Sequence, residues 1–284
     1  MKDILTVCQQ TFLAMPAIDT SVPLKVYGIT DIAAVKAKLM SLYGDVTVTA
    51  DGKRTELAEL NEVSEIEADA QTDFEKNRYN VTDVLRVTER LTREEGGCPW
   101  DKAQTHESIR INMIEEAYEA VDAIDKRDKP NMREEFGDVL LQSVLQSDIA
   151  RRSGEFDFAD VCDELCKKLI GRHTFIFGAD SAGNPDEALS LWEKAKAVEK
   201  NYDSVKTQLS KLPDNFPALL LCQKTYKKMK KAGLGGDPHA ELDGALAAGE
   251  YAAAINACVG LIADGGGDAE VELNKLVKKT IREL

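Results

Sequence analysis

Two acidic clusters lie close together in the middle of the sequence. The first contains Glu115, Glu116 and Glu119, and the second contains Glu135 and Asp138. Residues three or four apart share one face of an α-helix, so each cluster would present its carboxylates as a row. Like charges at this spacing repel each other, and partial burial increases the repulsion. A divalent cation between the rows would turn this repulsion into attraction.

The chemistry of these side chains favours a hard cation. Carboxylate oxygens suit Mg²⁺ or Mn²⁺, and Mg²⁺ demands near-octahedral oxygen coordination. Di-iron bundles place a histidine three residues after a glutamate, and no histidine follows either cluster. The alternative is that both rows are solvated helix surfaces, which an acidic chain shows often by chance. Two rows on consecutive helices, interleaved with apolar residues, favour the metal site.

Both clusters lie in segments with helical periodicity. In residues 106–126 and 131–154, apolar side chains recur at three- and four-residue intervals, and the second segment closes on Gly154. The link between them is short, so we expect the two helices to pack antiparallel with their acidic rows facing each other. Every strong segment from Thr82 to about Lys200 has this periodicity, which predicts an antiparallel helical bundle.

The segments on either side of these helices differ from them in composition and in predicted secondary structure. Residues 1–60 carry β-forming runs around one helical segment and predict a small β-α-β unit, too short to hold a large core alone. Residues 61–80 are polar and acidic without Gly or Pro, and we predict a linker there. Residues 81–205 form the predicted main helical domain, and residues 206–284 are predicted to be further helices. The predicted fold class is therefore mainly α, preceded by a small α/β unit.

The composition limits the classes of partner. The 284 residues carry a formal net charge of −14. We therefore expect no nucleic-acid or anionic-membrane partner, since either needs a basic surface. No apolar run reaches the ~18 residues of a membrane span, and the N-terminus lacks a clean signal-peptide segment, so we predict a cytoplasmic protein. Six scattered cysteines favour reduced thiols; Cys162 and Cys166 could share a helix face, but zinc would need two further ligands.

Several motifs occur in the order and spacing of a known family. They are GGCPWDKAQTHESI, EEAYEAVDAID, EEFGDVLLQ, GEFDFADV, KLIGRHTFIFG and LWEKAKAVEK. Together they resemble the MazG family of nucleoside triphosphate pyrophosphohydrolases over residues 82–200. The resemblance implies an all-α bundle that dimerises and that hydrolyses a nucleoside triphosphate, with Mg²⁺, to the monophosphate and pyrophosphate. It also implies a house-cleaning role in the nucleotide pool.

The family pattern gives roles to the acidic residues. Its paired glutamates, its third glutamate and its E-x-x-D on the next helix fall on the five carboxylates of the two clusters. The resemblance implies that Glu116, Glu119, Glu135 and Asp138 are metal ligands. A carboxylate not fully used in coordination, Glu115 or Glu116, could then orient or deprotonate the attacking water.

Candidate substrate contacts lie outside the acidic rows. Three cations could meet the phosphates: Lys168, Arg172 and Lys196. Each could equally be an ordinary exposed helix cation. Two aromatic side chains, Trp100 and Trp192, could stack on a base, and packing in the core or at an interface is the alternative for both.

This chain departs from the family in one motif. Many relatives have H-P-H-V-F where this chain has HTFIF, beginning at His173. The proline and the second histidine of the motif are therefore missing. We expect His106 and His173 to form hydrogen bonds in loops and to take no part in the chemistry.

Two flanking regions resemble parts of longer relatives. Residues 206–284 resemble a degenerate second MazG repeat, in which Glu250 and Ala253 occupy the E-x-x-D positions, so we predict that it has lost its metal site. The stretch LKVYGITDIAAVKAKLMSLYGDVTVT, within residues 1–60, resembles the end of a tetrapyrrole methyltransferase domain. The part that would hold S-adenosylmethionine is absent, so we expect no methyl transfer. Activity would then depend on the first repeat.

Two other functions stay open at this point. One is a non-catalytic scaffold or regulatory protein whose degenerate repeats mediate assembly, and the other is a pyrophosphatase for one modified nucleotide. The intact first acidic set favours the enzyme, because a scaffold has no reason to keep buried like charges. The predicted partners are a nucleoside triphosphate substrate and a second copy of the chain in a homodimer, and the predicted cofactor is Mg²⁺, with Mn²⁺ as the alternative.

Overall fold

The structure is a computed structural model that describes residues 4–16, 18–71, 74 and 78–283. The chain divides into two compact units, Met1–Leu165 and Cys166–Leu284. The sequence predicts boundaries near residues 60, 80 and 205, whereas this division falls inside a helix.

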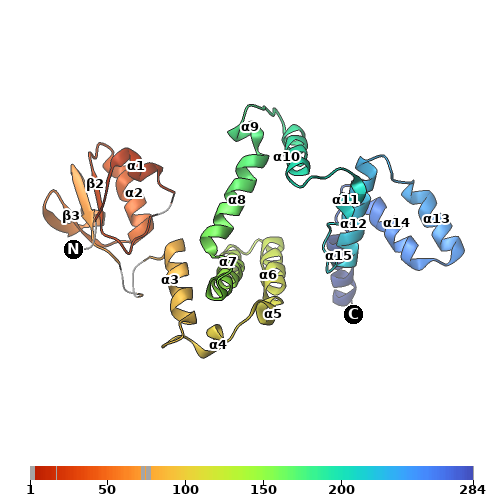
Figure 1. The fold of residues 1–284 in the computed structure, drawn as a ribbon, viewed down its shortest axis with the longest axis horizontal. Coiled ribbons are helices and arrows are strands. Elements are labelled where there is room, and N and C mark those ends of the chain that lie inside the picture. The colour runs from red at the N-terminus through yellow and green to blue at the C-terminus, as the bar shows by residue number, and fades with distance from the viewer. Residues whose placement is uncertain (1–3, 17, 72–73, 75–77, 284) are drawn as a thin grey trace. The chain divides into compact units, whose positions relative to one another are not determined.

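A five-stranded sheet occupies the N-terminal part of the first unit (Figure 1). Its strands are β1 (Leu5–Cys8), β2 (Leu24–Tyr27), β3 (Thr47–Ala50), β4 (Lys53–Glu56) and β5 (Glu65–Ala68). Their order is β1-β2-β5-β3-β4, with β1 and β2 parallel and the other neighbours antiparallel. Asp51 and Gly52 join β3 to β4 with φ of 45° and 78°. An Asp-Gly pair with positive φ at both residues is typical of a two-residue hairpin.

This sheet belongs to the larger of two buried apolar clusters in the described part of the chain. Helices α1 (Gln9–Ala14) and α2 (Ile32–Tyr43), with the short 3₁₀ turn η1 (Leu57–Glu59), pack with it. The cluster includes the fully buried side chains of Phe12, Leu39 and Ile66. The cluster takes in Ile66 and Ala68, so the core extends beyond residues 1–60, which the sequence predicts to be too short for a large core alone.

Strand β5 explains the difference. It lies within residues 61–80, the predicted linker, and pairs with both β2 and β3 in the middle of the sheet. Ile66 faces the core, while Glu65 and Glu67 form ion pairs with Lys25 at 3.0 and 2.8 Å. Buried apolar residues and acidic residues alternate along β5, but the many acidic residues around it give the segment the composition of a linker. The segment nevertheless forms a central strand of the sheet.

Helices follow the sheet. In order they are α3 (Val81–Thr92), α4 (Pro99–Lys102), α5 (His106–Ile109), α6 (Asn112–Lys126), α7 (Lys129–Ser153) and α8 (Phe158–Arg172). α6 and α7 pack side by side as a hairpin (Figure 1). Arg127 makes the turn with φ 56°, and the Asp128 side chain caps α7 by accepting from the backbone N–H of Asn131. The two helices predicted to carry the acidic rows are confirmed.

The second unit is helical throughout its regular structure. After the end of α8 come α9 (Thr174–Phe177), α10 (Pro185–Glu199), α11 (Val205–Leu209), α12 (Ala218–Lys231), α13 (Pro238–Ala248), α14 (Tyr251–Asp264) and α15 (Ala269–Arg282). Buried Gln223 joins α12 to the start of α15, since its amide donates to the carbonyl of Gly267 and accepts from the N–H of Ala269.

The fold class is mostly helical with a small mixed N-terminal sheet, as predicted. All six cysteines are free thiols. Within the described ranges, no helix has both the length and the apolar character needed to cross a membrane.

Candidate functional site

Three carboxylates from α6 and α7 converge. α6 presents Glu116 and Glu119 about one turn apart, and α7 presents Glu135. One oxygen of each lies within 4.8 Å of an oxygen of the other two. Glu135 is 8% exposed, Glu116 is half-buried and Glu119 is exposed. Among the residues that the structure describes, no other three His, Cys, Asp or Glu side chains meet in this way.

Burial and mutual repulsion raise two pKa values in this cluster. For Glu116 burial is the main cause of the raised pKa, followed by the charges of Asp138 and Glu119. For Glu135 burial again comes first, followed by the charges of Glu119 and Asp138. No Lys or Arg in the described ranges forms an ion pair with the carboxylates of Glu116, Glu119, Glu135 or Asp138. The cluster is therefore an uncompensated concentration of negative charge.

Asp138 and Glu115 complete the predicted acidic set. Asp138 is half-buried on α7, one turn after Glu135, and its charge contributes to both raised pKa values. Glu115 is exposed, and it accepts a hydrogen bond from the Asn112 side chain at 3.5 Å. Asp138 thus adjoins the cluster, while Glu115 faces solvent.

Gln142 shares the helix face of Asp138 and was not predicted. It follows Asp138 by four residues, or about one turn of α7. Its side chain is 8% exposed, and its Oε1 is buried without a hydrogen-bond donor from the described part of the chain. A buried amide oxygen without a donor costs free energy that a bound water or ligand would recover. The sequence offers no clear signal for Gln142, because Ser143, Gln146 and Ser147 are polar residues of the same helix.

Three of the five predicted substrate contacts meet in the second unit. The guanidinium carbon of Arg172 and Nζ of Lys196 each lie 5.1 Å from the centroid of the Trp192 ring. Arg172 is 4% exposed and donates from Nε and Nη2 to the Glu199 carboxylate at 2.7 and 2.9 Å. Arg172 thus already has a carboxylate partner and lies over the Trp192 ring, and its predicted phosphate contact stays a prediction.

The other two predicted contacts have fewer neighbours. Trp100, on α4, is 61% exposed, and Lys168, on α8, is exposed without an ion-pair partner among the described residues. Both histidines near the motifs are engaged in hydrogen bonds, as predicted. The His106 ring bonds to the side chain of Gln146, and the His173 ring donates to a backbone carbonyl one turn earlier at 2.7 Å.

The Arg172–Glu199 pair predicts a pH-dependent stability. Arg172 is the main cause that lowers the pKa of Glu199 from 4.5 to about 2. A pKa lowered in the folded state stabilises the protein above the unfolded-state value, and this contribution is lost as the pH falls from 4.5 toward 2. We expect Glu199→Gln to lower the thermal midpoint at pH 7 by roughly 1–4 °C, because Glu199 is partly exposed and screened.

Differential scanning calorimetry at pH 7, 5, 4 and 3 would measure this effect. The midpoints of wild type and Glu199→Gln should converge at the acidic end. A constant difference over the whole range would contradict the assignment of the stabilisation to the ionised carboxylate.

Comparison with known proteins gives several matches. The nucleoside triphosphate pyrophosphohydrolase of Escherichia coli K12 is 39% identical over 150 residues, which are 53% of this chain and 57% of that protein. A nucleoside triphosphate pyrophosphohydrolase/pyrophosphatase MazG of Thermotoga maritima is 37% identical over 151 residues, 53% of this chain and 57% of the relative. The uncharacterized protein YabN of Bacillus subtilis is 36% identical over 220 residues, 72% of this chain and 44% of the relative. The chain thus spans about half the length of these curated relatives.

A solved structure and a family model also match. A mazG-related protein from Thermotoga maritima aligns at 27% identity with 41% of this chain and 98% of its own, with a TM-score of 0.36. Residues 104–177 match the MazG nucleotide pyrophosphohydrolase domain. This match supports the predicted resemblance over these residues, whereas the methyltransferase likeness of residues 1–60 stays a prediction. The carboxylates that converge between α6 and α7 therefore lie in the segment of this chain that is similar to a MazG nucleotide pyrophosphohydrolase domain.

Proposed function

We propose that this chain is a nucleoside triphosphate pyrophosphohydrolase that depends on a divalent metal ion. It would hydrolyse its substrate to a nucleoside monophosphate and pyrophosphate. The observation that carries the proposal is the convergence of Glu116, Glu119 and Glu135 within 4.8 Å. The domain match over residues 104–177 and the names of the relatives support the same activity.

The side chains of the cluster suit Mg²⁺, with Mn²⁺ as the alternative. All of its donors are carboxylate oxygens, which hard divalent cations prefer. Two oxygens on one Mg²⁺ are at most about 4.2 Å apart, because each Mg–O distance is 2.0–2.1 Å. The present separations are all within 4.8 Å, close to this limit, which supports three ligands on one ion. The raised pKa values of Glu116 and Glu135 reflect a repulsion that such an ion would relieve.

In this proposal the acidic residues act either as metal ligands or as the general base. A bound divalent ion would neutralise the triphosphate and the charge that develops at the α-phosphorus. Glu119, Glu135 and Asp138 serve as its ligands, and Glu116 serves as ligand or base. Glu116, which is half-buried beside the other ligands, or the exposed Glu115 would take the proton of the attacking water. The base takes a proton from water as its oxygen bonds to the α-phosphorus, the bond to the bridging oxygen breaks, and pyrophosphate leaves.

The substrate contacts follow from the remaining predicted residues. A contact of Lys168 with a phosphate oxygen stays part of the proposal, since Lys168 has no carboxylate partner among the residues described. Trp100 would stack on the base, because its ring is largely exposed. Stacking of Trp192 on a base stays a prediction, because its ring faces Arg172 and Lys196.

A second copy of the chain belongs to the proposal. Large apolar side chains are exposed along α6 and α7: Ile114, Tyr118, Val121, Phe136, Val139 and Leu140. Apolar surface of this extent favours a covering partner, and a homodimer would complete the predicted helical bundle. We place the activity in the cytoplasmic nucleotide pool, as a house-cleaning function, with no nucleic-acid partner because the net charge is −14.

The test is an assay of the purified chain with a panel of ribo- and deoxyribonucleoside triphosphates in Mg²⁺. We expect equal amounts of monophosphate and pyrophosphate, and no product in excess EDTA. Orthophosphate without pyrophosphate would mean that a different bond is cut. No turnover of any member would favour the non-catalytic scaffold.

A further inference from the structure

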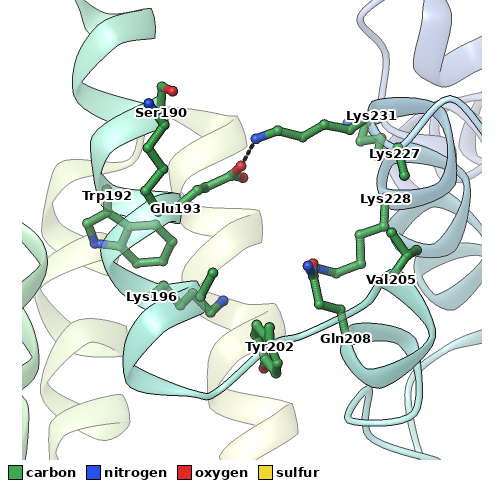
Figure 2. Close-up of a pocket in the computed structure, with 13 residues that line it drawn as sticks. Ser190, Trp192, Glu193, Lys196, Tyr202, Val205, Gln208, Lys227, Lys228 and Lys231 are labelled. Carbon is green, nitrogen blue, oxygen red and sulfur yellow. Dashed lines mark hydrogen bonds and ion pairs between the residues drawn. The ribbon is translucent and has the colours of Figure 1, made fainter.

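The second unit contains a cavity of about 470 Å³ (Figure 2). Side chains from α10 and α12, with α11 and the loop before it, line the cavity. Its charged lining consists of one glutamate, Glu193, and five lysines: Lys194, Lys196, Lys227, Lys228 and Lys231. This is a local excess of positive charge in a chain whose net charge is −14.

Within the described ranges, most of these lysines form no ion pair. Glu193 is paired with Lys231, as the dashed line in Figure 2 shows. Lys228 donates to the neutral side chain of Gln208 at 3.2 Å. Lys196, like Lys227 and Lys228, has no carboxylate partner among the residues that the structure describes. The one carboxylate in the lining, Glu193, thus neutralises Lys231, and the positive charges of the other lining lysines have no ion-pair partner among the described residues.

The surroundings of Lys196 show the same imbalance. Its side chain is half-buried against the Trp192 ring, 5.1 Å from the centroid. Burial lowers the pKa of Lys196 most, the positive charges of Arg172, Lys228 and Lys224 lower it further, and the charge of Glu199 offsets only part of this. An anion in the cavity would reverse these effects on the charged form of Lys196.

We infer that this cavity binds an oligophosphate chain through Lys196, Lys227 and Lys228. Three ammonium groups from two helices suit a compact anion with several charges, which a single carboxylate would not satisfy. A volume of 470 Å³ is within the usual range of small-ligand sites, about 300–1,000 Å³. The chain could be inorganic or part of a nucleotide. α12 lies outside residues 104–177, so Lys227 and Lys228 are not part of the matched domain.

This inference concerns binding, and it does not depend on hydrolysis at the acidic cluster. The experiment is isothermal titration calorimetry on the full chain in EDTA, with inorganic tripolyphosphate, ATP and adenosine as ligands. We expect binding of tripolyphosphate and ATP and none of adenosine. Tighter binding of ATP would show that the phosphate chain is recognised as part of a nucleotide, and equal binding would show that the phosphate chain suffices.

Charge removal locates the site. The double variant Lys227→Gln/Lys228→Gln should bind tripolyphosphate about tenfold or more weakly, since two charge-assisted contacts are lost. The matched control is Lys275→Gln/Lys279→Gln, which removes two exposed lysines from α15. Equal binding by wild type and the α12 variant, an equal loss in the control, or no binding of tripolyphosphate would each overturn the inference.

Two further measurements separate this site from the proposed catalytic one. In a Trp100→Phe background Trp192 is the only tryptophan, and its emission should change as tripolyphosphate binds beside it. Glu119→Gln should retain metal-free binding even where it loses nucleotide cleavage. If the wild type cleaved nucleotides but did not bind tripolyphosphate in EDTA, only this inference would be overturned. If it bound tripolyphosphate in EDTA but did not cleave nucleotides, only the proposed hydrolysis would be overturned.

Discussion

Glu119→Gln is expected to lower kcat/KM for nucleoside triphosphate cleavage about a thousandfold. Glutamine preserves the size of the side chain and removes its charge, so one of three converging anionic oxygens is lost. Metal-ion catalysis contributes several kcal/mol of transition-state stabilisation, and each 1.36 kcal/mol is a factor of ten in rate. Asp138→Asn should act in the same direction, because Asp138 adjoins the cluster. Steady-state release of pyrophosphate would measure both.

The control for this prediction is Asp125→Asn. Asp125 is an exposed carboxylate of α6 and lies outside the converging set, so its loss changes the net charge equally. Its kcat/KM should stay within about twofold of wild type, as is usual for isolated surface substitutions. If Glu119→Gln were as active as Asp125→Asn, the acidic cluster would not be the catalytic site.

Glu135→Gln is expected to stabilise the metal-free protein and to abolish its response to Mg²⁺. The folded-state pKa of Glu135 lies above its ordinary value of 4.5, so protonation favours the folded state. That contribution is complete below pH 4.5 and is lost as the pH rises through the folded-state pKa. In EDTA, the thermal midpoint of the variant should therefore exceed that of wild type by an amount that grows from pH 4.5 to pH 8.

Mg²⁺ should reverse this order for the wild type. An ion present at a hundred times its dissociation constant adds about 2.7 kcal/mol to stability. This corresponds to roughly 5–10 °C for a domain of 150–250 residues. The increase should be largest at high pH, where Glu116 and Glu135 are ionised, and absent in Glu135→Gln.

Glu155→Gln serves as the control for the stability series. Glu155 is exposed just after the end of α7, so its variant should keep the full Mg²⁺ response. A wild-type midpoint that does not depend on Mg²⁺ at any pH would argue against a divalent cation at the cluster.

The hairpin of α6 and α7 could be predicted because its signals are local. The three-residue spacing of the acidic residues, the apolar periodicity and the short link between the helices all lie within about forty residues of sequence. Together they predict which carboxylates face one another, and Glu116, Glu119 and Glu135 do meet.

Other features depend on partners that no local pattern reveals. The charge of Arg172 is paired with Glu199, which lies at the end of the next long helix along the chain. The local sequence around Arg172 does not reveal this carboxylate, so it favours a phosphate contact instead. Gln142 is notable only once burial is known, because an exposed glutamine would have no unsatisfied oxygen. The lysines of the α10–α12 cavity come from two helices that are brought together only by tertiary packing, so the sequence around each helix does not reveal the cavity.

The central position of β5 has a consequence for how the chain folds. β2 and β3 are joined only through β5, so a nascent chain that ends before Glu65 holds two separate strand pairs, β1 with β2 and β3 with β4. Two-stranded ribbons are marginally stable in water. The pairing of Leu24 with Ala68 is also non-local, which slows folding. A fragment cut at residue 60 would therefore lack the strand that unites the sheet, and an excised N-terminal piece must extend past Ala68 to form its core.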